Sequence, residues 1–164
     1  MGPSIRLEPI GFVRHGATDD VVKEQWAELV ARVEILDPYA EGLTAIDGFS
    51  HLILLFWMHR LPEEARQRLV VKPRGMLRHG LSLEELPTIG VFACDSPARP
   101  NPIGLTITEL VSREGRTLTI RGVDAYDGAP VLDIKPYSLD RLVSGAKDAP
   151  WHEELIRRTG ARRV

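Results

Sequence analysis

Short alternating runs of apolar and polar residues dominate this chain and predict β-strands rather than long helices. The segment His51–His59 is apolar between its two histidines, which is typical of a strand buried on both faces. Six further runs have the length and composition of strands: residues 8–14, 32–37, 88–94, 104–113, 116–126 and 129–137. Seven closely spaced strands predict a mainly β fold, namely a small closed or nearly closed antiparallel barrel with a few peripheral helices.

Glycine turns are expected to join neighbouring strands. Gly115 lies at the tip of a predicted hairpin, between the strands at 104–113 and 116–126. Asp127 and Gly128 form a turn-favouring pair, which predicts a sharp corner before the last strand.

Helical signals occur in three places, at residues 19–30, 82–86 and 150–158. Thr18 or Asp19 can cap the first helix. Ser82 and Glu85 have the spacing of a capping box in the second segment. The third begins with a proline, carries early acids and late bases, and stops at Gly160.

The composition favours one soluble globular domain. The chain has 164 residues, 43% of them hydrophobic, which suits a single core. We therefore expect one domain over residues 1–164, with residues 138–164 as a helical extension at its C-terminal side. The longest apolar run, Leu52–Met58, is too short for a bilayer, and no signal-peptide core precedes it. One cysteine excludes an internal disulfide, so we expect a cytoplasmic protein without a membrane segment.

The net charge of −2 argues mildly against a surface built wholly for nucleic acid. Basic residues nevertheless cluster locally, at Arg60, Arg66, Arg68, Lys72, Arg74 and Arg78, and again at Arg157, Arg158, Arg162 and Arg163. Either cluster can face phosphates, or it can be a solvated loop and helix end.

Two common kinds of site are not indicated. The chain has neither a G-x-G-x-x-G motif nor a β-α alternation, so a nucleotide would not be held in the Rossmann manner. It also lacks a set of His, Asp and Glu residues at metal-ligand spacing, so no metal is predicted.

The run DSPARPNPIGL, residues 95–105, is unusually rich in proline. Proline fixes its own φ angle and restricts the residue before it, which here includes Arg99 and Asn101. A rigid loop loses little entropy on binding, and an arginine in it offers a fixed fork to a carboxylate or phosphate. The alternative is a stiff turn in which Asn101 caps its own backbone.

Acidic residues gather around the corner predicted at Asp127. Asp124, Asp127 and Asp133 can accept hydrogen bonds from a ribose diol or lie near a cation. Alternatively, Asp127 only makes the turn. Asp133 and Lys135 share a strand face and can simply pair with each other.

Four segments occur in an order that closely resembles the TsaA-like family, which includes the bacterial TrmO tRNA methyltransferases. They are EPIGFVR, YAEGLTAIDGFSHLILLFWMHR, GVFACDSPARPNPIGLTITEL and DAYDGAPVLDIKPY, and together they cover roughly residues 8–137. The resemblance implies a small β-barrel and a homodimer that binds S-adenosylmethionine near its interface. It also implies N6-methylation of threonylcarbamoyladenosine at position 37 of a tRNA.

Motif positions within this resemblance imply the site residues. Cofactor contacts are expected at His59, Arg60, Asp95, Leu105, Tyr126, Asp127, Gly128 and Ala129. Substrate contacts are expected at Arg99, Asn101, Arg74 and Arg78. No residue is assigned as catalytic, and Asp133 is the one candidate for a proton acceptor.

The sequence departs from the family pattern in two places. Asp95 occupies a position where family members usually have arginine, which inverts a charge in the expected cofactor pocket. The P-R-Q-P-G-L segment near the N-terminus of TrmO proteins is replaced by an unrelated sequence. Two alternatives therefore stand beside tRNA methylation: a methyltransferase acting on a small metabolite, and a non-catalytic module that binds S-adenosylmethionine.

Overall fold

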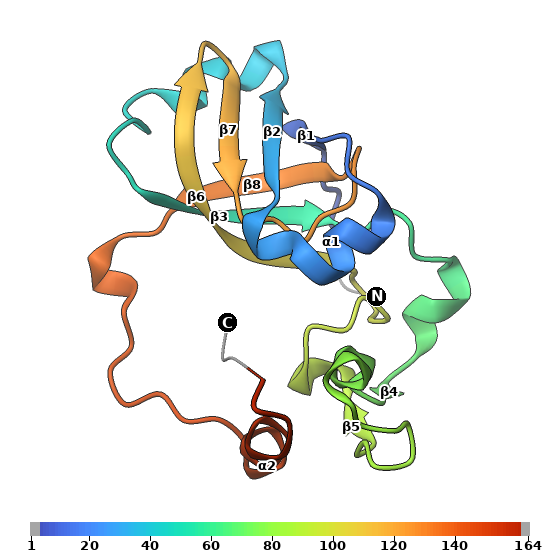
Figure 1. Cartoon of the computed structure of the whole chain (residues 1–164). Coiled ribbons are helices and arrows are strands. Elements are labelled where there is room, and N and C mark those ends of the chain that lie inside the picture. The colour runs from blue at the N-terminus through green and yellow to red at the C-terminus, as the bar shows by residue number, and fades with distance from the viewer. Residues whose placement is uncertain (1–3, 162–164) are drawn as a thin grey trace. The chain divides into compact units, whose positions relative to one another are not determined.

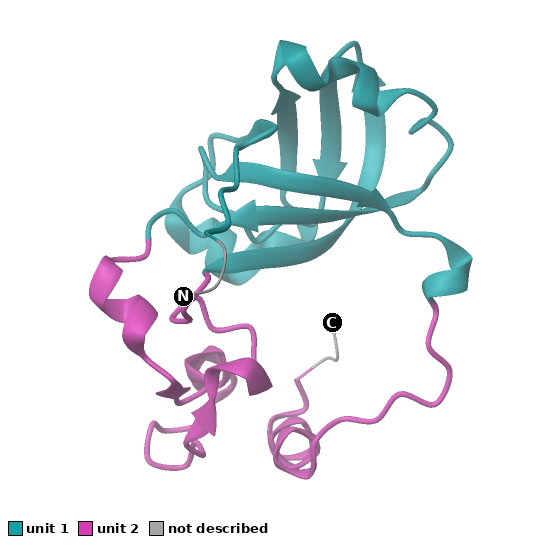
Figure 2. Cartoon of the chain, turned by 180° about the vertical axis from the view of Figure 1, so that it is seen from behind, with its two compact units in different colours: residues 1–60, 102–141 teal, residues 61–101, 142–164 magenta. Residues whose placement is uncertain are grey.

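The computed structural model describes residues 4–161, and its contacts divide the chain into two compact units. Unit 1 comprises residues 1–60 and 102–141, and unit 2 comprises residues 61–101 and 142–164 (Figure 2).

Unit 1 is a closed six-stranded barrel (Figure 1). Its strands are β1 (Gly11–Arg14), β2 (Val30–Ile35), β3 (His51–Trp57), β6 (Ile103–Glu114), β7 (Thr117–Arg121) and β8 (Pro130–Pro136). They follow the order β1-β2-β7-β6-β3-β8 around the barrel, and all neighbouring pairs are antiparallel. The predicted mainly β barrel is confirmed.

Alternation along the strands fills the barrel with apolar side chains. Val33, Leu54 and Leu118 are each at most 1% exposed, while their neighbours in sequence point outward. Strand β6 instead turns Thr106 and Thr108 inward. Their hydroxyls donate to the backbone carbonyls of residues 122 and 121, so these buried polar groups are satisfied.

Gly104, in the proline-rich motif, is required by close packing. It lies opposite Phe56 in the β3–β6 register, and a Cβ atom there would be 2.3 Å from the Phe56 ring. The phenylalanine ring therefore occupies the space that any larger residue at position 104 would need.

Both predicted glycine turns are present. Gly115 has φ +59° in the hairpin between β6 and β7, and Gly128 has φ +81° before β8. This left-handed region favours glycine because it has no Cβ atom to clash with the backbone.

The first helix is shorter than its apolar stripe indicates. Helix α1 covers Asp19–Gln25, followed by a single 3-10 turn, η1 (Trp26–Glu28). Thr18 caps α1 as expected, accepting a bond from the Val21 N–H at 3.5 Å. The predicted end at Val30 is wrong because this residue begins β2 and pairs with β7. Two further 3-10 segments complete unit 1, η2 (Asp37–Leu43) and η6 (Leu139–Arg141).

Unit 2 contains little regular structure besides its last helix. Its elements are η3 (Glu63–Gln67), β4 (Val70–Val71), η4 (Arg74–His79), β5 (Ile89–Gly90), η5 (Val91–Ala93) and α2 (Pro150–Thr159). Helix α2 begins with proline and ends at Gly160 with φ +63°, as the sequence predicts. Arg162 and Arg163 of the basic tail lie outside the described residues.

Two predictions in unit 2 are wrong. The strand expected over residues 88–94 is reduced to Ile89–Gly90, because its partner β4 has only two residues and the Val91 carbonyl accepts instead from the Arg99 guanidinium. The helix expected over residues 82–86 is a turn. The Ser82 N–H does donate to the Glu85 carboxylate at 2.8 Å, but Pro87 follows and stops a helix.

Within residues 4–161, no helix has the length and apolar character needed to cross a membrane.

Candidate functional site

Arg60 connects three segments of the barrel unit. Its guanidinium forms an ion pair with Asp19 at the start of α1, with an N–O distance of 2.5 Å. The same group lies over the ring of Tyr126, with 4.8 Å between the guanidinium carbon and the ring centroid. Arg60 therefore joins the segment after β3, the start of α1 and the corner before β8. Two of these segments, residues 59–60 and 126–129, contain predicted cofactor contacts.

The corner itself is a tight turn fixed to β1. The Ala129 N–H donates to the Tyr126 carbonyl at 3.0 Å, and the Gly128 N–H donates to the Val13 carbonyl at 2.9 Å. Asp127 accepts a bond from the His15 N–H at 2.8 Å through Oδ1. Ala129 is buried. Asp127 therefore does make the turn, and it also presents a carboxylate in a fixed position.

His15 is a residue of this site that the sequence did not indicate. Its ring Nε2 lies 3.0 Å from the Ala125 carbonyl, and its Nδ1 accepts a bond from the Ala17 N–H at 3.2 Å. The Nε2–H tautomer satisfies both bonds. His15 thus holds the corner twice, through its backbone at Asp127 and through its ring at Ala125. A histidine followed by glycine in a loop has no pattern that would have shown this.

His59 lies within electrostatic reach of Arg60 and Asp127. Partial burial lowers the pKa of its imidazole below the ordinary value, and the positive charge of Arg60 lowers it further. Asp127 and a hydrogen bond with the Trp57 backbone act in the opposite direction but do not cancel these effects. At neutral pH the cluster therefore contains a neutral imidazole beside a fixed cation and a carboxylate.

Leu105 lies on the outer wall of the barrel. It is 60% exposed and faces Leu55 across the β3–β6 register, in the half of the strand pair that leads to His59. The structure thus gathers six of the eight predicted cofactor contacts at the end of β3 and the corner, with Leu105 on the adjoining strand.

The remaining predicted residues belong to unit 2, where Asp95, Arg99 and Asn101 share the proline-rich loop. The Arg99 guanidinium donates to the carbonyls of Ser96 at 2.8 Å, of Val91 at 2.9 Å, and of Cys94. The loop is therefore stiffened by its arginine as well as by its prolines. Asp95 and Asn101 are exposed.

Arg74 and Arg78 occupy η4 and are exposed. The Arg78 Nε–H donates to the Gly75 carbonyl at 2.9 Å, which orients that side chain along the helical turn.

The other candidates have structural partners. Asp133 pairs with Lys135 at 2.5 Å, as their spacing predicts, and it also accepts a bond from the Ile134 N–H. Across the described part of the chain, no group of three or more His, Cys, Asp or Glu residues is arranged to hold a metal ion.

Comparison with protein families agrees with the motifs. The family model for the tRNA-methyltransferase O N-terminal domain matches residues 23–141. The chain belongs to the TrmO family. The match includes His59, Arg60, the proline-rich loop and the corner at Asp127.

Individual relatives support the same assignment. An S-adenosyl-L-methionine-binding protein of Archaeoglobus fulgidus is 38% identical over 135 residues, covering 80% of this chain and 88% of that protein. The tRNA (adenine(37)-N6)-methyltransferase of Mus musculus is 39% identical over 145 residues, covering 84% of this chain. A crystal structure of TrmO superimposes with a TM-score of 0.69 at 29% identity, over 89% of this chain.

This chain covers very different fractions of the relatives' own lengths. This chain spans 88% of the Archaeoglobus protein, 64% of the solved TrmO chain, and only 32% of the mouse methyltransferase. A second Archaeoglobus protein, 40% identical over 130 residues, is likewise spanned over only 32% of its length.

Proposed function

We propose that this protein transfers a methyl group from S-adenosylmethionine to N6 of the threonylcarbamoyladenosine at position 37 of a tRNA. The observation that carries the proposal is the cluster around Arg60. Two motifs far apart in the sequence, HR at 59–60 and YDGA at 126–129, meet there through the contact between Arg60 and Tyr126. The names of the Archaeoglobus and mouse relatives support the cofactor and the tRNA respectively.

The donor set at this cluster fits the proposed cofactor. S-Adenosylmethionine has a carboxylate, an ammonium group, a sulfonium, a ribose diol and an adenine. Arg60 suits the carboxylate, because a guanidinium fork matches its two oxygens. The carboxylate of Asp127, held in place by His15, can accept bonds from the diol or the ammonium group. Leu105 offers apolar surface on the adjoining strand.

When bound, S-adenosylmethionine supplies an activated methyl group on a positively charged sulfur. The protein's contribution is then alignment of the acceptor nitrogen and exclusion of water. The neutral imidazole of His59 adds no second positive charge beside Arg60, which suits a site for a cationic ligand. No residue is assigned as proton acceptor, since Asp133 is engaged by Lys135.

The proposed homodimer has a suitable face on the barrel. Three apolar pairs lie across β3 and β6 on its outer side, namely Ile53–Ile107, Leu55–Leu105 and Trp57–Ile103. Leu105 and Ile107 are 60% and 45% exposed. The flanking ion pairs Asp133–Lys135 and Glu109–Arg121 carry no net charge, so a second copy of this face would not be repelled. Because Leu105 belongs to this face, the dimer would bring a second chain next to the cofactor site.

Charge distribution favours unit 2 as the part of the chain that binds RNA. Unit 2 contains eleven Lys and Arg against eight Asp and Glu, whereas unit 1 contains ten against fifteen. A polyanion is attracted to the unit with excess positive charge, and the exposed Arg74 and Arg78 on η4 are its proposed phosphate contacts.

A methyl-transfer assay tests the proposal and separates the alternatives. Purified protein is incubated with radiolabelled S-adenosylmethionine and one of three acceptors: tRNA carrying threonylcarbamoyladenosine, the same tRNA with unmodified adenosine 37, or a metabolite extract. The proposal requires label in the first tRNA alone. Label in the unmodified tRNA contradicts the threonylcarbamoyl requirement, and label only in the extract favours a small-molecule methyltransferase.

Asp95 provides the test for a non-catalytic module. The variant Asp95→Arg restores the charge that family members usually have at this position. If the native protein binds the cofactor without transferring methyl to any acceptor, and the variant binds it more tightly, the binding-module alternative gains support. Tighter binding by the native protein means that Asp95 has a role of its own.

A further inference from the structure

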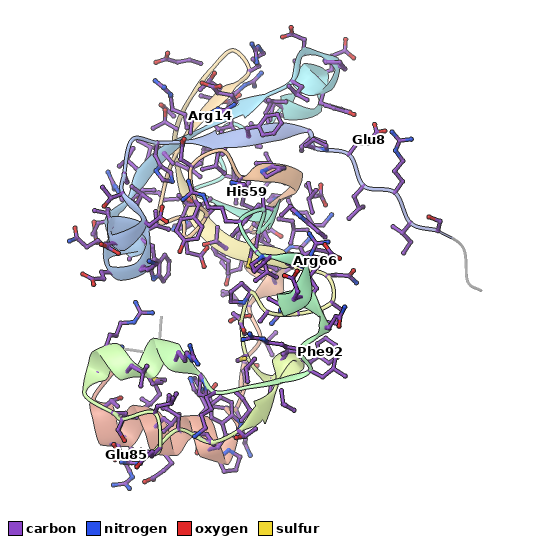
Figure 3. All side chains as sticks on the ribbon, turned by 90° about the vertical axis from the view of Figure 1, so that its right-hand side faces the viewer. Glu8, Arg14, His59, Arg66, Glu85 and Phe92 are labelled. Carbon is purple, nitrogen blue, oxygen red and sulfur yellow. The ribbon has the colours of Figure 1, made fainter. Side chains whose placement is uncertain are left out.

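Unit 2 exposes an aromatic ring and two aliphatic side chains on two segments that are paired through their backbones. Phe92 is 81% exposed, and Leu69 and Val70 are 61% and 63% exposed. Figure 3 shows Phe92 at an outer edge of the ribbon. Such exposure is unusual for phenylalanine, because burying its ring is normally favourable.

The backbone brings these residues together with a basic side chain. Strand β4 pairs with β5 so that Val70 faces Gly90, and the Val91 N–H continues the pairing by donating to the Leu69 carbonyl at 3.0 Å. Phe92 follows Val91 and Arg68 precedes Leu69, so the two residues adjoin the last backbone hydrogen bond of this pairing. The backbone therefore brings the exposed Phe92 and the exposed Arg68 onto neighbouring segments.

In the described part of the chain, two arginines of unit 2 are not neutralised by ion pairs. Among the described residues, neither Arg68 nor Arg74 has an acidic partner within ion-pair distance, whereas Arg66 on η3 pairs with Glu63. The core of a protein–protein interface is normally depleted in charged residues, which does not match this surface. An exposed ring on a segment adjoining that of an uncompensated arginine instead matches surfaces that bind single-stranded nucleic acid, where bases stack on aromatic rings and cations contact phosphates.

We propose that Phe92 is a stacking platform for an unpaired base of the RNA substrate, with Arg68 contacting the adjacent phosphate. The inference rests on the proposed function, because the unpaired bases nearest the reaction are those of an anticodon loop. It extends that function by assigning to Phe92 the discrimination between unpaired and paired bases of the RNA. A duplex RNA, whose bases are stacked inside the helix, would gain nothing from Phe92.

Equilibrium binding of a fluorescent anticodon stem-loop RNA tests this proposal. The variants are Phe92→Ala, Phe92→Trp and Arg68→Ala, and a fully paired RNA of equal length is the control ligand. Truncation of a side chain this exposed is expected to leave the fold intact, which circular dichroism and thermal melting check. Phe92→Ala is expected to weaken stem-loop binding at least fivefold, with an unchanged dependence on salt and no effect on the duplex. Phe92→Trp retains binding, and Arg68→Ala lowers both the affinity and the salt dependence.

Three results would overturn the proposal. Equal stem-loop binding by Phe92→Ala and the native protein removes the stacking role, while the proposed function stands if native protein still methylates tRNA. A change from dimer to monomer in sedimentation without loss of RNA affinity shows that the ring belongs to a protein interface. If the native protein neither binds the stem-loop nor methylates tRNA, the proposed function fails together with this inference.

Discussion

The guanidinium carbon of Arg60 lies 4.8 Å from the centre of the Tyr126 ring, while the same guanidinium pairs with Asp19. One side chain thus joins the end of β3, the start of α1 and the corner before β8. Because it is half-exposed, its contribution to stability is small, so a variant at this position tests the ligand-binding role proposed above.

Arg60→Ala is expected to weaken S-adenosylmethionine binding by about 10- to 100-fold, because the ligand loses a hydrogen bond to a charged group and that bond's free energy corresponds to this change in affinity. The free energy of unfolding should fall by only about 1 kcal/mol, because the ion pair and the contact with the ring are exposed. Calorimetric titration and urea denaturation measure the two quantities. Asp19→Asn is the matched control, since it removes the ion pair and keeps Arg60. Equal loss of affinity in both variants would mean that Arg60 acts through Asp19 rather than on the ligand.

Arg99→Ala is expected to destabilise the proline-rich loop by about 1–3 kcal/mol, because three backbone carbonyls lose a charged donor. Arg99→Lys should rescue little of this, since an ammonium cannot reproduce the guanidinium fork. Hydrogen exchange of residues 91–99 and thermal denaturation measure the effect. If hydrogen exchange of residues 91–99 is unchanged and ligand affinity is lost, Arg99 binds the ligand, as the sequence predicts, and does not stabilise the loop.

Gly104→Ala is expected to destabilise the barrel by about 1–3 kcal/mol, because the new methyl group overlaps the Phe56 ring. The double variant with Phe56→Leu should recover part of the loss, since the smaller side chain frees the space. Chemical denaturation of the four proteins completes this cycle. Strictly additive losses would show that the two residues do not compete for the same volume.

The stability contributed by His59 should depend on pH in a known direction. Its pKa is lowered in the folded protein, so the unfolded chain binds a proton first as the pH falls through about 6.5. The native protein should therefore lose stability between about pH 7.5 and 5.5 relative to His59→Gln, which has no such proton to bind. Parallel denaturation curves at several pH values measure the difference. A difference that is constant with pH, or that grows in the opposite direction, would contradict the lowered pKa.

Arg74→Ala and Arg78→Ala are expected to weaken tRNA binding and flatten its dependence on salt. Each lost phosphate contact should reduce the slope of log K against log salt by about 0.7–0.9. Arg157→Ala, on the exposed surface of α2 and paired with Glu154, is the matched control for removal of a basic residue from unit 2. The same slope in the η4 variants and the native protein would exclude this face from the RNA interface.

The barrel could be predicted from sequence because the residue patterns that specify its strands and turns are local. The apolar run at His51–His59 and the turn glycines at 115 and 128 each indicate a strand or a turn by themselves, although β3 is buried on one face and only partly buried on the other, not buried on both faces as expected. The shortened strand at 89–90 could not be predicted, because it depends on a side-chain contact, in which the Arg99 guanidinium donates to the Val91 carbonyl. The end of the helical segment likewise depends on a long-range contact, because Val30 pairs with Arg121 of β7 as a strand residue.

The sequence indicated the segments that meet in the candidate site, but not the contacts between them. The motifs indicated Arg60 and Asp127, but the contact between Arg60 and Tyr126 depends on barrel closure, which no local pattern encodes. His15 was missed for the same reason, since its two partners lie more than a hundred residues away along the chain.

Calorimetric titration of the purified protein with S-adenosylmethionine, after removal of any copurified cofactor, tests the proposed cofactor site most directly. We expect one site per chain with a dissociation constant in the micromolar range, about −8 kcal/mol, and a clear loss of heat in Arg60→Ala. Absence of binding by the native protein, with its fold intact, would contradict the assignment of the Arg60 cluster as the cofactor site and with it the proposed methyl transfer.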